Sequence, residues 1–129
     1  MDITVRYIGL DSEPDRNREM NEWLQRFDFD WARVPGVNVS NALDIRNYDS
    51  EKRRRRFGYD LLPQEIGCFL AHRNCWRECA DDNRLMLILE SDAKANNGVD
   101  LPLILEHISQ VHTKFDLVRM QATFPRNEV

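Results

Sequence analysis

The sequence contains no long apolar run and has little glycine, proline or cysteine. Its longest aliphatic stretch is Leu85 to Leu89, whereas a helix that crosses a bilayer needs about 20 apolar residues. Only 5 Gly and 5 Pro occur in 129 residues, which disfavours collagen-like and low-complexity chains. The polar N-terminus also lacks the apolar stretch of a signal peptide. We therefore predict one globular domain over residues 1–129, in the cytoplasm and without a transmembrane segment.

The chain also lacks net positive charge. Its 22 acidic residues exceed its 18 basic residues, and the net charge of −4 provides no overall field that attracts nucleic acid or an anionic membrane. The local exception is the basic run from Lys52 to Arg56, which precedes Phe57 and Tyr59. An RNA-binding surface and a solvated charge run both explain this pattern, and the net charge favours the second. We predict no nucleic-acid partner.

The cysteines are few, odd in number and close together. Three thiols within 12 residues argue against a disulfide framework. With His72 they have the spacing of one helical face, at Cys68, Cys75 and Cys79. This set spans about 16 Å along a helix, whereas the ligands of one zinc ion lie within about 2.3 Å of it, so at most one adjacent pair can bind the same ion. We predict small core residues with reduced, slowly reacting thiols.

Apolar periodicity predicts strands that alternate with helices. The expected strands are residues 3–10, 31–34, 85–89 and 115–120, and the expected helices are residues 14–27, 63–80 and a third from Asp100 to about Val111. The twenty-odd residues after Gly36, closed by the basic run, are expected to form a polar loop. The 85–89 strand is expected to be buried on both faces. This order predicts an α/β fold with a mostly parallel sheet and flanking helices.

Two carboxylates follow the Leu85–Leu89 strand. Glu90 and Asp92 flank Ser91 at the carboxyl end of a strand, where open α/β sheets bind their ligands. Carboxylate oxygens are hard ligands that suit Mg²⁺ or Mn²⁺, and such a cation would neutralise a substrate diphosphate. An acidic loop after a strand explains the same tripeptide, so the spacing alone leaves both interpretations open.

Two arginines lie in the first turn of the first expected helix. Arg16 and Arg18 follow a strand end directly, where a nucleotide phosphate can be bound by guanidinium groups and by the helix terminus. Arg18 has the alternative of an ion pair with Glu22, four residues further along the helix. Arg16 is therefore the better candidate for a phosphate contact.

These segments together resemble glycosyltransferase family 25, the bacterial lipooligosaccharide galactosyltransferase type that also includes collagen galactosyltransferases. The run from Leu62 to His72 (LPQEIGCFLAH), followed by Trp76, is similar to the family's LTPGEIGC-x-LSH-x-x-x-W helix. The run from Leu87 to Ala93 (LILESDA) is similar to its ILEDDA motif. Weaker matches are the first strand end with Asp15-Arg16 and the last expected strand. The resemblance covers nearly the whole chain.

The resemblance implies a GT-A, Rossmann-like nucleotide-sugar-binding fold. It implies a UDP-sugar donor such as UDP-galactose and a saccharide acceptor in lipopolysaccharide or a related glycan, in the cytoplasm or at the inner face of the membrane. It assigns Glu90 and Asp92 to a divalent metal, Mn²⁺ or Mg²⁺. The residues that it assigns to the nucleotide sugar are Ile8, Gly9, Leu10, Arg16 and Glu90. It names no catalytic base.

The sequence departs from the family pattern in two residues and in length. Ser91 replaces the middle acid of the metal motif, and Leu62 replaces a Thr helix cap, which removes a side-chain acceptor. Nothing in the chain matches the second half that helps to form the acceptor site, so we expect an N-terminal portion that binds nucleotide without appreciable transfer. The alternative is a non-catalytic half-domain that binds a partner or itself. Apolar residues of the last expected strand then predict a homodimer.

Overall fold

The computed structural model describes residues 2–40, 45–46, 48–95 and 98–120. The chain up to Val99 forms one compact unit, and the chain from Asp100 forms a second. The first unit contains a sheet with its connecting helices, and the second contains a helix followed by an irregular segment. That both units belong to one domain, as the sequence predicts, stays a prediction. No helix among the described residues is long and apolar enough to span a membrane.

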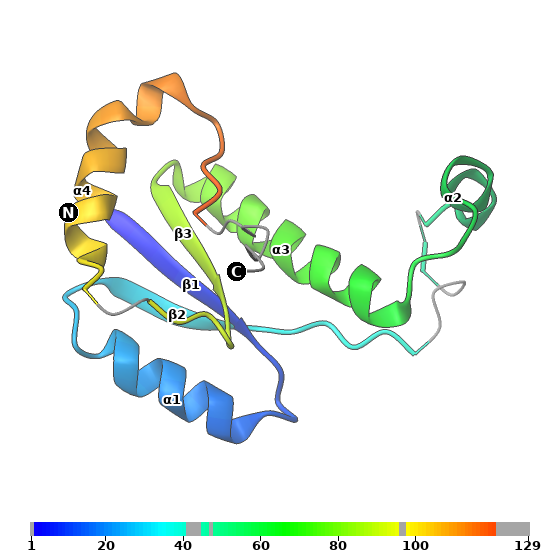
Figure 1. The fold of residues 1–129 in the computed structure, drawn as a ribbon, viewed down its shortest axis with the longest axis horizontal. Helices are drawn as coiled ribbons and strands as arrows, with labels where there is room; N and C mark the ends of the chain where they lie inside the picture. The colour runs from blue at the N-terminus through cyan, green and yellow to red at the C-terminus, as the bar shows by residue number, and fades with distance from the viewer. Residues whose placement is uncertain (1, 41–44, 47, 96–97, 121–129) are drawn as a thin grey trace, which may run out of the picture. The chain divides into compact units, whose positions relative to one another are not determined.

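Three parallel strands form the sheet of the first unit (Figure 1). They are β1 (Ile3–Gly9), β2 (Asp30–Pro35) and β3 (Leu85–Glu90), in the order β2-β1-β3. Helix α1 (Pro14–Leu24) connects β1 to β2, and helix α3 (Pro63–Asp82) precedes β3. This parallel sheet with flanking helices is a Rossmann-like arrangement, and it confirms the predicted fold class.

Helices α1 and α3 cover opposite faces of the sheet. Side chains alternate between the two faces along β1. The Tyr7 hydroxyl donates to Asn21 Oδ1 on α1 at 2.6 Å, and the Arg6 Nε donates to Glu78 Oε1 on α3 at 2.7 Å. The two crossovers run in opposite directions along the sheet, so right-handed connections place their helices on opposite faces.

The hydrophobic core follows from this alternation. Buried apolar side chains of the α1 side are contributed by β1, α1 and β3, and they are Ile3, Val5, Tyr7, Met20, Leu24 and Leu87. On the α3 side the buried residues include Ile66, Ala71 and Cys75. Of β3, only Leu87 is buried, so the prediction of a strand buried on both faces is wrong for the rest of it. The reason is that β3 lies at the edge of the described sheet.

Ion pairs link separate segments of the first unit at the amino ends of the strands. Arg84, immediately before β3, lies 3.5 Å from Asp2, 3.0 Å from Asp30 and 2.6 Å from Asp82. These carboxylates come from three different parts of the unit: the N-terminus, the start of β2 and the end of α3. One guanidinium group therefore links all three at this end of the sheet.

Helix α3 begins as the sequence predicts, but with an incomplete cap. Leu62 is the capping residue and makes no side-chain cap bond, while Pro63 occupies the first helical position. The Leu62 amide instead donates to Glu65 Oε2 at 2.7 Å. One turn further, Gly67 lies so close to the segment after β2 that a Cβ there would come within 2.2 Å of the Val37 carbonyl oxygen. Only glycine permits this approach.

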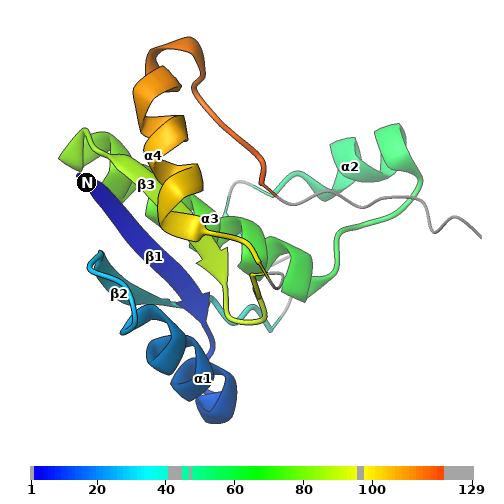
Figure 2. The same ribbon diagram turned by 60° about the vertical axis from the view of Figure 1, so that its left-hand side comes forward.

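The basic run is helical, which corrects the predicted loop. It lies in α2 (Ser50–Phe57), where the Asp49 side chain accepts the Lys52 amide at 2.9 Å and Gly58 ends the helix with a φ of 84°. These caps stabilise a short helix that has no buried residue. Both views show α2 away from the sheet (Figures 1 and 2). Residues 41–44 and 47 of the predicted loop lie outside the described residues.

In the second unit, helix α4 (Leu101–Val111) begins as predicted, with the Asp100 side chain accepting the Leu103 amide at 3.1 Å. A 3-10 turn, η2 (His112–Lys114), follows. Residues 115–120, all of them described, form no strand, so the predicted fourth strand is wrong. Apolar side chains of this segment are exposed, including Leu117 at 78%.

Candidate active site at the carboxyl edge

The carboxyl ends of the strands bring the predicted site segments together. Ile8 of β1 lies opposite Glu90 of β3 in the sheet register. The Ser91 amide donates to the Ile8 carbonyl oxygen at 3.0 Å, and the Gly36 amide donates to the Gly9 carbonyl oxygen at 3.0 Å. The turn after β1 and the acidic motif after β3 are therefore neighbours, although about 80 residues of sequence separate them.

The turn from β1 into α1 depends on the close approach of a side chain to Gly9. A Cβ at Gly9 would lie 2.1 Å from Asn17 Oδ1. The Asn17 amide group donates to the Leu10 carbonyl oxygen at 2.7 Å. The first turn of α1 is therefore held against the end of β1, beside the residues that the resemblance assigns to a nucleotide sugar.

The Glu13 side chain connects Arg16 to the acidic motif. Its Nη1 is 3.0 Å from Glu13 Oε1, and the Ser91 hydroxyl lies 3.5 Å from Glu13 Oε2. Arg18 instead pairs with Asp15 at 2.9 Å, so the predicted pair with Glu22 is wrong. Asp15 lies three residues before Arg18 on the same helical face. Ion pairs between residues three apart on a helix are as favourable as pairs four apart.

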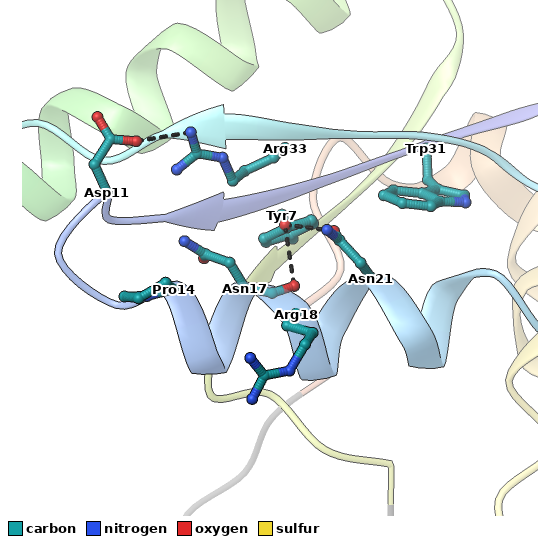
Figure 3. A pocket seen from close by; sticks show the side chains of 8 residues that line it. All are labelled: Tyr7, Asp11, Pro14, Asn17, Arg18, Asn21, Trp31 and Arg33. Atoms are coloured by element: carbon teal, nitrogen blue, oxygen red, sulfur yellow. Dashed lines mark hydrogen bonds and ion pairs between the residues drawn. The ribbon is translucent and has the colours of Figure 1, made fainter.

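An open depression of about 480 Å³ lies between α1 and β2 (Figure 3). Its lining residues are Tyr7, Asp11, Pro14, Asn17, Arg18, Asn21, Trp31 and Arg33. Sequence reasoning missed most of this surface. The sequence pattern that could have identified it is the alternation of side chains along β2. The register pairs Arg33 with Tyr7 and so places Trp31 and Arg33 on the α1 side of the sheet.

Polar contacts in this depression are made by a buried phenol and a guanidinium. Tyr7 is fully buried, and its burial raises the pKa of its hydroxyl, while the charge of Arg33 lowers it to a smaller extent. Arg33 donates to the Gly9 carbonyl oxygen at 3.0 Å and to Asp11 Oδ1 at 2.7 Å. Arg33 thereby ties the end of β2 to the turn after β1.

The two acids of the metal motif, Glu90 and Asp92, are both exposed. The Ala93 amide donates to the Glu90 carbonyl oxygen at 2.9 Å, which closes a turn over Ser91 and Asp92. Glu90 Oε1 lies against α3, while Asp92 makes no ion pair with any described residue. That both carboxylates hold one cation stays a prediction.

The cysteines differ in burial, contrary to a uniform core stripe. Cys75 is buried as predicted, Cys79 is half-buried and donates to the Arg84 carbonyl oxygen at 3.3 Å, and Cys68 is exposed. The core prediction is wrong for Cys68 because the first turns of α3 reach the carboxyl edge of the sheet rather than its covered face. Desolvation and the neighbouring Glu90 raise the pKa of the Cys68 thiol.

The arginines of α2 make local contacts. Arg55 pairs with Glu51 at 2.6 Å, and Arg53 stacks 4.0 Å from the centre of the Phe57 ring. These contacts fit the interpretation of a solvated charge run.

Comparison with known proteins identifies the family. A family model described as glycosyltransferase family 25 (LPS biosynthesis protein) matches residues 3–126. No curated protein and no solved structure matches the chain. The matched residues include α3, the acidic motif after β3 and the turn after β1, so the match confirms the resemblance seen in the sequence. The chain therefore belongs to glycosyltransferase family 25.

Proposed function

We propose that this chain binds a UDP-sugar and a divalent cation at the carboxyl edge of its sheet, for transfer of galactose to a saccharide acceptor of lipopolysaccharide or a related glycan. The observation that carries the proposal is the hydrogen bond from the Ser91 amide to the Ile8 carbonyl oxygen. It places the acidic motif beside the turn into α1. Ligands of open α/β sheets bind at this edge.

The α1 side of this edge suits the nucleotide. Trp31 offers an aromatic surface, and Asn17 and Asn21 offer amide groups in the depression beside the turn after β1. Arg16 lies in the first turn of α1, whose free backbone N–H groups favour a phosphate. The nucleoside would thus lie along α1, with Gly9 and Leu10 at the diphosphate.

The acidic motif suits the cation. Glu90 and Asp92 supply hard oxygen donors, which fit Mn²⁺ or Mg²⁺. When bound, such an ion stabilises negative charge on the departing diphosphate. In the transfer, the acceptor hydroxyl oxygen bonds to the anomeric carbon, the bond from that carbon to the diphosphate oxygen breaks, and the hydroxyl proton passes to a base or to water.

Ser91 fits its surroundings better than an acid would. Its hydroxyl lies 3.5 Å from Glu13 Oε2. An aspartate at this position would bring a second negative charge against Glu13, and like charges this close repel each other. The loss of the family's middle acid is therefore compatible with metal binding by the two outer acids.

Calorimetry of UDP binding with and without Mn²⁺ tests the proposal. Wild-type protein should bind UDP more tightly with Mn²⁺ than without it. In Asp92→Asn, the UDP affinity measured with Mn²⁺ should be lower by about tenfold or more. Asp81→Asn is the matched control, because it removes an exposed carboxylate of α3 near the opposite end of the sheet. Equal UDP affinity with and without metal in all three proteins would refute the site.

A transfer assay separates an enzyme from a binding module. Product formed from UDP-galactose and a saccharide acceptor would establish the activity. Metal-dependent UDP binding without product is the result expected for an N-terminal portion of the enzyme, whereas neither UDP binding nor product would favour the non-catalytic alternative.

A further inference from the structure

Three metal-ligating side chains converge on the α3 side of the carboxyl edge. Cys68 and His72 lie four residues apart on α3, and therefore on one helical face. Glu90 is the last residue of β3, 22 residues after Cys68. One ligand atom from each of the three lies within 4.8 Å of the other two. The sequence shows only the Cys68–His72 pair, because the third ligand comes from another element.

His72 is oriented as a metal ligand. Its Nδ1 lies 2.9 Å from the Cys68 carbonyl oxygen, and because a carbonyl only accepts, Nδ1 carries the proton. The lone pair is then on Nε2, which faces Glu90 Oε1 at 3.8 Å, a separation too long for a hydrogen bond. A backbone carbonyl that holds one ring nitrogen while the other faces the site is the usual support of a metal-binding histidine.

Two of the three separations between the ligand atoms are close to those of a tetrahedral ion. Cys68 Sγ lies 3.6 Å from Glu90 Oε1, and His72 Nε2 lies 3.8 Å from the same oxygen. Ligand atoms bonded to one tetrahedral zinc are about 3.4–3.6 Å apart, given bonds of about 2.0–2.3 Å. Cys68 Sγ also lies 3.7 Å from His72 Nδ1, so side-chain rotation would have to bring Sγ and Nε2 to the same ion. Cys68 and Glu90 are both exposed, so a fourth position faces solvent.

We propose that Cys68, His72 and Glu90 bind a zinc-like divalent cation with an open fourth position. A mixed set of sulfur, nitrogen and oxygen donors favours borderline-soft ions such as Zn²⁺ over Mg²⁺ and Mn²⁺. Bound metal would join the first half of α3 to the end of β3. The site does not rest on the proposed nucleotide binding, although Glu90 belongs to both.

Cobalt titration of the full chain tests the site, because a thiolate bound to Co²⁺ gives a charge-transfer absorption that oxygen ligands do not give. Wild-type protein should develop this band up to one equivalent and lose it when Zn²⁺ is added. Cys68→Ser should abolish the band, and His72→Gln should weaken Co²⁺ binding about tenfold or more. Cys79→Ser is the matched control and should keep the band, since Cys79 lies near the other end of α3.

Two results would overturn the proposal: no thiolate band in wild-type protein, or a band that survives Cys68→Ser. Far-ultraviolet circular dichroism checks that each variant folds. If Cys68→Ser does not fold, the Co²⁺ affinity of His72→Gln tests the site in its place. Asp92→Asn separates this site from the nucleotide site, because it should keep the cobalt band while it loses metal-dependent UDP binding. In wild-type protein, a cobalt band without metal-dependent UDP binding would refute the nucleotide site alone, and metal-dependent UDP binding without a cobalt band would refute the Cys68, His72 and Glu90 site alone.

Discussion

The two ends of the same three strands are built differently. At the amino end, charged side chains are paired with one another: Arg84 with three carboxylates, and Arg6 with Glu78 and Asp30. At the carboxyl end, two glycines are closely approached, Gly9 by the Asn17 side chain and Gly67 by the Val37 backbone carbonyl. The carboxylates of the acidic motif and one thiol are exposed there.

The difference separates stability from ligand binding. Paired charges at the amino end have little remaining capacity for a ligand, whereas the exposed carboxylates and thiol and the half-buried imidazole of the carboxyl end keep theirs. Substitutions at the amino end should therefore change the free energy of unfolding and spare UDP binding. Substitutions at the carboxyl end should affect both when they alter the close approaches there.

The largest effect is expected for Gly67→Ala. Alanine normally stabilises a helix interior by about 1 kcal/mol relative to glycine. At this position its Cβ would meet the Val37 carbonyl oxygen, so we expect a net loss of about 1–3 kcal/mol in urea denaturation. Asn74→Ala, at an exposed position of α3, serves as the control and should be neutral or slightly stabilising. A Gly67→Ala protein more stable than wild type would show that α3 does not lie this close to the segment after β2.

Arg6→Met tests the amino end. The Arg6 side chain is only 12% exposed and bonds to Glu78 at 2.7 Å, and hydrogen bonds to charged groups contribute about 1.5–3 kcal/mol. We expect a loss of about 2 kcal/mol in the free energy of unfolding, with UDP affinity unchanged. Weakened UDP binding by the folded variant would contradict the division between the two ends.

Tyr7→Phe tests the α1 side of the sheet. Loss of the hydrogen bond to Asn21 should cost about 1 kcal/mol. Burial raises the folded pKa of Tyr7 above its ordinary value of 10.0, so its contribution is present below pH 10 and is lost as the pH rises through the folded pKa. The variant should therefore lose less stability than wild type in alkaline urea titrations. Parallel pH profiles for the two proteins would show that Tyr7 does not titrate differently on folding.

The smallest effect is expected for Leu62→Thr. Leu62 caps α3 without a side-chain acceptor and is 60% exposed. A threonine hydroxyl can accept a free amide of the first turn, so the variant should gain about 0.5–1 kcal/mol in urea denaturation. A loss of stability would mean that the leucine side chain makes packing contacts that outweigh the cap.

The sequence predicted the features that depend on local pattern. Apolar periodicity located the three strands and helices α1, α3 and α4, but it missed α2. The acidic motif was placed correctly at a strand end. The side chains that meet across elements could not be predicted in the same way. Glu90 faces Cys68 only because the register with Ile8 turns it toward α3.

Two errors have the same physical origin. The apolar segment at residues 115–120 has a strand-like pattern, but it pairs with no strand in the described part of the chain. Cys68 lies on the same helical stripe as Cys75, but it lies beside the exposed Glu90 at the end of β3 and stays exposed, whereas Cys75 is buried. Periodicity gives the face on which a residue lies, and tertiary packing decides whether that face is covered.

Paramagnetic broadening by Mn²⁺ with UDP shows directly which end of the sheet binds the ligand. Broadening of amide NMR signals falls steeply with distance, and the two ends of β1 are about 20 Å apart. The signals of Leu10 and Ser91 should disappear at Mn²⁺ levels that leave Thr4 and Arg84 sharp, and Asp92→Asn should restore them. Broadening centred on Thr4 and Arg84, or spread evenly over both ends, would contradict a metal–nucleotide site at the carboxyl edge.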